Sequence, residues 1–112
     1  MTRYLISFDD GAMTFPEEEG PAVGEAAHAV VRAAQEAGVW IFGGGVEKQR
    51  ASIVATDGTV TNGPYPATKA VIGGFAIIDV PSRDEALQWA AKIAVACRGA
   101  QELRELLPDP IV

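Results

Sequence analysis

The sequence predicts one α+β domain in which two helices cover a single antiparallel sheet. The 112 residues are enough for one hydrophobic core and too few for two, so we expect a single domain over residues 1–112. Two segments carry apolar residues at helical spacing, and several short runs are rich in β-branched and aromatic residues. Their order is strand, helix, strand, hairpin, strand, helix, strand. This is the βαββαβ pattern of a ferredoxin-like fold with an extra hairpin.

The first half of the chain supplies a strand, a helix and a second strand. Residues 4–8 are aromatic and aliphatic and predict the first strand, which ends at Asp9. Apolar side chains recur at helical spacing over residues 23–37, and Gly38 then ends the helix because glycine readily adopts the left-handed conformation. The continuous apolar run at residues 39–42 predicts the next strand.

A hairpin and a central strand follow. Residues 51–56 and 59–61 flank an Asp-Gly pair, which is a strong signal for a tight hairpin turn. Residues 62–69 contain two prolines and a glycine, so we expect them to be irregular. Residues 71–80 are apolar on both faces and predict a buried central strand that ends at a proline.

The second helix is expected to begin at Ser82. Glu85 stands three residues further on and completes a capping box, and Gly99 ends the helix. The last segment is ambiguous. Helix propensity favours a helix over residues 100–107, whereas its position, its length and the stop at Pro108 favour a final strand. We predict the strand, because it completes the fold.

Composition restricts the partners of the chain. The net charge of −6 and the absence of a Lys/Arg cluster argue against nucleic acid, and no apolar stretch approaches the roughly 20 residues that span a membrane. No signal peptide is visible, and the single cysteine, Cys97, suits a reducing cytoplasm. With one histidine and one cysteine, no metal site of the usual zinc ligands can be assembled, and we expect no cofactor.

The predicted sheet has one face without helices. Two helices can cover only one face, yet half of every apolar strand points to the other, and water would not accept that surface. We therefore expect a homodimer, in which a second copy covers the bare face.

Several motifs give the chain a family resemblance. It resembles the YCII-related proteins, and most closely the branch named for an Asp-Gly-Pro-Phe motif, through Asn62-Gly63-Pro64-Tyr65, Thr68-Lys69, Ile72-Gly73-Gly74-Phe75 and the run from Asp84 to Ala90. The resemblance implies a dimeric α+β barrel with apolar pockets, and it implies no defined reaction. Asn62 and Tyr65 replace the Asp and Phe of the motif, and Ala67 and Ala70 stand where relatives usually carry Glu.

Three features outside this segment have structural and functional interpretations. His28 lies roughly 130° from the middle of the apolar helical stripe, taking 100° per residue, so we place it on the solvent side, away from a pocket. Cys97 falls within an apolar stripe and is expected to be a small buried hydrophobic residue. The run Gly43-Gly44-Gly45 either lets the chain leave its strand or admits a ligand against bare backbone.

The segment at residues 62–69 is the best candidate for a binding site. Tyr65, Thr68 and Lys69 could offer two hydroxyl groups and a cation to a small anionic or carbonyl-bearing molecule, with Asp9 and Gly74 nearby. No catalytic residue can be assigned, and whether the protein is an enzyme stays open. The alternative is a non-enzymatic interaction module that dimerises through its bare sheet face, in which these residues only brace the loop against the partner subunit.

Overall fold

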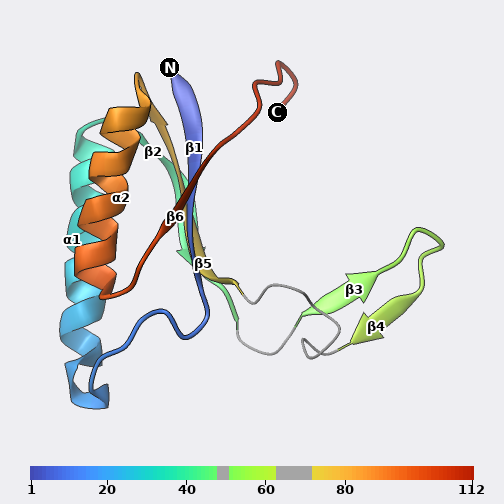
Figure 1. Ribbon diagram of the computed structural model, residues 1–112, viewed down its shortest axis with the longest axis horizontal. Helices are drawn as coiled ribbons and strands as arrows, with labels where there is room; N and C mark the ends of the chain where they lie inside the picture. Colours follow the sequence, from blue (N-terminus) through green and yellow to red (C-terminus); the bar gives the residue numbers. More distant parts are fainter. Residues whose placement is uncertain (48–50, 63–71) are drawn as a thin grey trace.

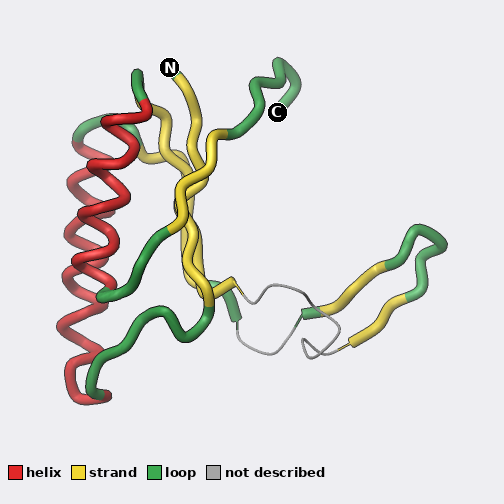
Figure 2. Tube along the Cα trace, in the orientation of Figure 1, coloured by secondary structure: helices red, strands yellow, loops and turns green. Residues whose placement is uncertain are grey.

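The computed structural model of the chain describes residues 1–47, 51–62 and 72–112 (Figures 1 and 2). It is an α+β structure with two helices packed on one face of an antiparallel sheet, and a separate hairpin. The elements in chain order are β1 (Thr2–Asp9), the short 3₁₀ helix η1 (Glu17–Glu19), α1 (Gly20–Glu36), β2 (Trp40–Gly45), β3 (Ser52–Val54), β4 (Val60–Asn62), β5 (Ile72–Val80), α2 (Arg83–Cys97) and β6 (Glu102–Glu105).

The predicted ferredoxin-like arrangement is confirmed, including its extra hairpin. The main sheet has the order β2-β5-β1-β6, and β3 pairs with β4 in a second sheet of two strands. The ambiguous final segment contains the strand β6, which pairs with β1 from Tyr4↔Glu105 to Ser7↔Glu102. Position in the fold therefore overrides helix propensity there, because pairing along β1 satisfies the backbone hydrogen bonds of this segment.

Alternation along β5 separates the two faces of the sheet. Ala76, Ile78 and Val80 are buried against the helices, while the residues between them point the other way. The buried core lies between this face and the helices and consists of Tyr4, Ile6, Ala34, Val39, Ala76, Ile78, Val80, Ala86 and Ala90. The helices and the sheet thus form two layers (Figure 1).

We call the face away from the helices the open face. Strand register places on it the apolar residues Leu5, Phe42, Phe75 and Ile77 and the charged residues Arg3, Asp79, Glu102 and Arg104. No described helix covers this face (Figure 2). The expectation that two helices leave one face bare therefore agrees with the observed layers.

Helix α1 begins three residues earlier than the apolar spacing predicts. Gly20 and Pro21 form its first turn, and η1 leads into it. Proline is compatible with the first helical turn because the amide hydrogen it lacks has no partner within the helix. The apolar stripe marks only the part of the helix that packs on the sheet.

The predicted cap of α2 is present. Ser82 has an extended backbone, and its Oγ accepts a hydrogen bond from the backbone N–H of Glu85 at 3.2 Å. This bond satisfies one of the amide groups that have no partner in the first turn.

Replacing Ser82 by Ala should lower the free energy of unfolding by about 1 kcal/mol, because the amide of Glu85 loses its acceptor. Urea denaturation followed by circular dichroism measures this change. Ser82→Asp is the matched control and should retain most of the stability, since Asp caps helices as well as Ser does. Equal losses in the two variants would show that the cap is not the source of the effect.

Candidate functional site

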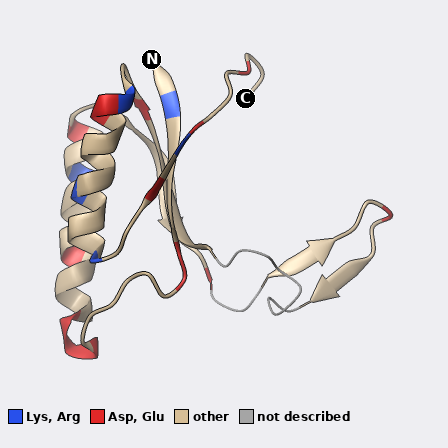
Figure 3. Ribbon diagram, in the orientation of Figure 1, with Lys and Arg blue, Asp and Glu red and all other residues tan. Residues whose placement is uncertain are grey.

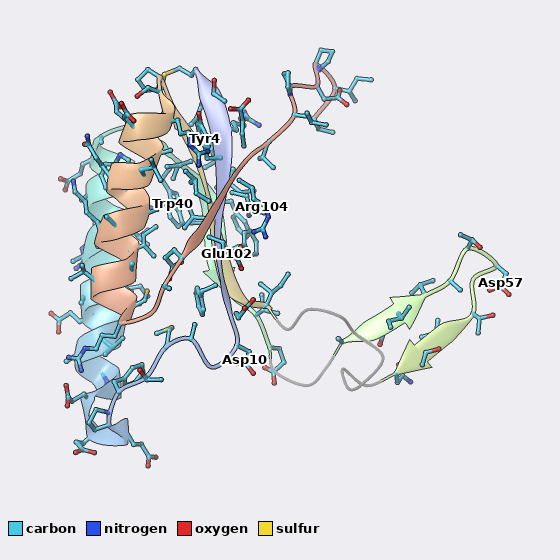
Figure 4. The ribbon with its side chains drawn as sticks, in the orientation of Figure 1. Tyr4, Asp10, Trp40, Asp57, Glu102 and Arg104 are labelled. Atoms are coloured by element: carbon cyan, nitrogen blue, oxygen red, sulfur yellow. The ribbon has the colours of Figure 1, made fainter. Side chains whose placement is uncertain are left out.

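A cavity of about 320 Å³ lies between the two helices and the β2 edge of the main sheet. Its walls come from both helices and three strands. The helices contribute Ala27, His28, Val30 and Val31 of α1 and Ile93 and Cys97 of α2. The strands contribute Phe8 of β1, Trp40 and Gly43 to Gly45 of β2, and Phe75 and Ala76 of β5, and Gln101 completes the lining. Trp40 projects from β2 into the space between the sheet and the helices (Figure 4). We call this space the helix–sheet cavity.

The glycine run of β2 lets this strand approach β5 closely, and it also leaves open space in the cavity. Gly43 pairs with Ala76, and a Cβ added to Gly43 would stand 2.5 Å from the carbonyl oxygen of Phe75. Only glycine allows this approach of β2 to β5. Gly45 pairs with Gly74, and its added Cβ would meet nothing nearer than the carbonyl oxygen of Gly73 at 4.0 Å. Missing side chains at this end of the strand therefore leave room beside bare backbone.

The backbone of β2 also presents polar groups at the edge of the sheet. The N–H of Val46 donates to the carbonyl oxygen of Gly73 at 2.9 Å, so Val46 faces β5. Because neighbouring residues of a strand direct their N–H and C=O groups to opposite sides, Gly45 and Gly43 direct theirs away from β5. β2 is the edge strand, so these groups can meet a ligand.

Few side chains add polarity to the walls. His28 is exposed, and Gln101 donates from Nε2 to the carbonyl oxygen of Gly99 at 3.0 Å. Burial raises the pKa of the Cys97 thiol, because desolvation disfavours the thiolate. No Lys or Arg lines the cavity in the described part of the chain. The cavity is therefore mainly apolar, with hydrogen-bonding groups at its margin.

The residues expected to bind a ligand are placed only in part. Tyr65, Thr68 and Lys69 lie outside the described residues. Asp9 is exposed at the end of β1, and Gly74 is buried on β5, where an added Cβ would stand 2.9 Å from the ring of Phe8. Neither Asp9 nor Gly74 lines the helix–sheet cavity, although Gly74 pairs with Gly45 in its wall.

His28 is exposed, as predicted, but it is not remote from a pocket. The sequence predicts a pocket between the sheets of a dimer or between the sheet and the loop at residues 62–69, and His28 lies away from both places. The helix–sheet cavity instead opens beside the edge strand, where the flank of α1 that carries His28 forms one wall. The glycine run was the one sequence signal that pointed to this place.

The described residues contain no cluster of His, Cys, Asp or Glu side chains that could hold a metal ion.

None of the helices in the described part of the chain has the length and apolar character needed to cross a bilayer.

Cys97 should react slowly with alkylating reagents, because the thiolate is the reactive form and burial opposes its formation. At pH 8 we expect iodoacetamide to modify the native protein at least about tenfold more slowly than the urea-unfolded chain. The raised pKa also means that the unfolded chain loses this proton before the folded chain does. The free energy of unfolding should therefore fall as the pH rises through 9.0, the ordinary thiol value.

Cys97→Ala is the control for this pH dependence. It should remove the part of the decrease in the free energy of unfolding that is due to the thiol. Rapid alkylation of the native protein at pH 8 would contradict the buried placement.

Comparison with known protein families places the chain in one of them. No curated protein matches the chain at a significant level. The family model of the YCII-related domain matches residues 2–108, which is almost the whole chain. The chain belongs to the YCII-related family.

Proposed function

We propose that this protein is a homodimer that binds a small, mainly apolar molecule carrying a carbonyl group. The helix–sheet cavity is the observation on which the proposal rests. Its volume of about 320 Å³ lies at the lower end of the range of known small-molecule sites, and such sites combine apolar walls with a few polar groups.

The polar groups at the margin favour a carbonyl over a charged group. The N–H groups of Gly43 and Gly45, the ring of His28 and the amide of Gln101 can donate hydrogen bonds. No described wall residue is a Lys or Arg, and the chain carries a net charge of −6, so an anion would find little compensation here. A neutral acceptor fits these donors better.

The candidate residues from the sequence extend this proposal. We propose that Tyr65, Thr68 and Lys69, with Asp9 and Gly74, form a second polar rim at the glycine end of the sheet. We also propose that the chain is one domain of the Asp-Gly-Pro-Phe branch and works in the cytoplasm. The motif at residues 62–65 and the single cysteine support these assignments.

Binding, rather than a reaction, is the function we assign. General acid–base catalysis needs a titratable group that a neighbour holds in place. His28 is the one histidine of the chain and lines the cavity, but it is exposed and no neighbour within the described residues holds its ring in place by a hydrogen bond.

Filling the cavity tests this function. Gly45→Leu places a side chain in the open space, and Gly24→Leu is its control, because Gly24 is exposed on α1, does not line the cavity, and would have no atom within 4 Å of an added Cβ. Ligand-observed NMR with acetophenone, ethylbenzene and benzoate compares a carbonyl, an apolar and an anionic probe. We expect acetophenone to bind best, its binding to be lost with Gly45→Leu and to be retained with Gly24→Leu. Unchanged binding by Gly45→Leu would place the ligand elsewhere.

A second candidate function is that of an interaction module without a ligand. The open face favours it, because Phe42 is 63% exposed and its ring lies against that of Phe75, with the ring centroids 6.0 Å apart and the ring planes tilted by 50°. Exposed apolar surface of this kind marks interaction sites. Absence of binding by all three probes, together with a stable dimer, would favour this alternative.

Sedimentation at micromolar concentration should give about twice the chain mass of 11.8 kDa. Ile77→Lys should produce monomers, because it places a charge in the middle of the open face, whereas Ile78 is 1% exposed and belongs to the core. The control is Val95→Lys, since Val95 is 79% exposed on α2. A wild-type protein that sediments as a monomer at all concentrations would refute the dimer.

A further inference from the structure

Within the described residues, the β3–β4 hairpin forms an arm whose strands pack appreciably only on each other. Its strands pair with each other from Ser52↔Asn62 to Val54↔Val60, and every residue from 51 to 62 is exposed. The arm extends from the sheet on the side opposite the helices (Figure 1). A two-stranded hairpin without a packing partner is marginally stable in water, so this arm lacks a covering surface.

A left-handed glycine and a hydrogen bond define the turn of the arm. Gly58 takes a left-handed φ of 88°, and the backbone N–H of Thr59 donates to Oδ1 of Asp57 at 2.9 Å. Hydrogen bonds from the side chain of Thr59 and from its backbone N–H lower the pKa of Asp57. Ser52 Oγ also donates to Asn62 Oδ1 at 2.9 Å, at the base of the arm. The arm therefore has a defined shape but no hydrophobic core.

One surface of the arm is apolar. Val54 and Val60 lie directly opposite each other in the register, so their side chains share a face, and they are 64% and 55% exposed. Ile53 points to the other face and is 37% exposed, opposite Thr61. The face with the two valines exposes more apolar surface than the other face, so covering it would remove more apolar surface from water.

The open face offers a suitable partner surface. Leu5, Phe75 and Ile77 are half-buried there, and Phe42 is exposed. The charged residues of the face are two cations and two anions, and Arg104 Nη2 bonds Glu102 Oε2 at 2.8 Å, away from the helices (Figures 3 and 4). Two chains that each carry −6 repel each other, and a locally neutral apolar face is the surface where they can approach most easily.

We propose that each arm packs its Val54 and Val60 face onto the open face of a second copy of the chain. The arm points away from its own sheet, so it reaches the sheet of a neighbour more readily (Figure 1). A two-fold axis then makes the exchange mutual, with two equivalent arm contacts in each dimer. This inference rests on the homodimer proposed above and adds the element that holds it together.

The double variant Val54→Thr with Val60→Thr tests the contact. Threonine keeps the shape and strand propensity of valine but places a hydroxyl in an apolar contact. Four such changes occur per dimer, and we expect the dissociation constant from sedimentation equilibrium to rise by about a hundredfold or more. Thr61→Val is the matched control on the other face of the arm and should leave the constant within about threefold.

A second measurement does not depend on substitutions. In hydrogen exchange, the amides of Ser52 to Val54 and of Val60 to Asn62 should be protected at concentrations where the dimer forms and should lose protection on dilution. Near-UV circular dichroism of Trp40 and Trp89, both in the main body, verifies that the variants keep their fold.

The outcomes separate the arm contact from the dimer itself. A wild-type dimer whose dissociation constant is unchanged by the valine variants, or whose arm amides exchange freely, would overturn the arm contact and leave the dimer standing. A monomeric wild-type protein would overturn both.

Discussion

The pairing of β5 with β1 and β2 is the interaction on which the rest of this structure depends. The register Ile6↔Ala76 and Tyr4↔Ile78 directs one set of side chains into the core under the helices. A shift by one residue would exchange the buried set for the open-face set, so this register is strongly specified. The same alternation that builds the core therefore determines which apolar residues remain on the uncovered face.

The glycine end of the sheet shows how this register also produces a cavity. β2 approaches β5 closely because Gly43 has no Cβ, and two pairs further along Gly45 faces Gly74 with no side chain on either strand. Helices span this gap without filling it, so Val30, Val31 and Ile93 remain only half-buried above it. Well-packed interiors rarely leave such space, and its position beside edge-strand amides makes it suited to a ligand.

Sequence reasoning predicted the elements better than it predicted the site. Period-two and helical spacing located the main strands and both helices, because burial on one face imposes those periods directly. The helix–sheet cavity could not be read in the same way. It depends on how far α1 stands from β2, which is set by the packing of Trp40 and the glycines and not by any local pattern. His28 was placed by its angle on the helix, which does not tell where the neighbouring strand ends.

Asp79 gives an independent reason to expect that the open face is covered. It pairs with Arg3 across the strands, yet its Oδ1 is buried without a hydrogen-bond partner among the described residues. A buried carboxylate oxygen without a donor costs at least about 1–3 kcal/mol, and proteins seldom retain that cost without compensation. The open face continues from this residue into a hollow bordered by Leu106 and Leu107. A second copy seated on this face could supply a donor to this oxygen, which agrees with the proposed homodimer.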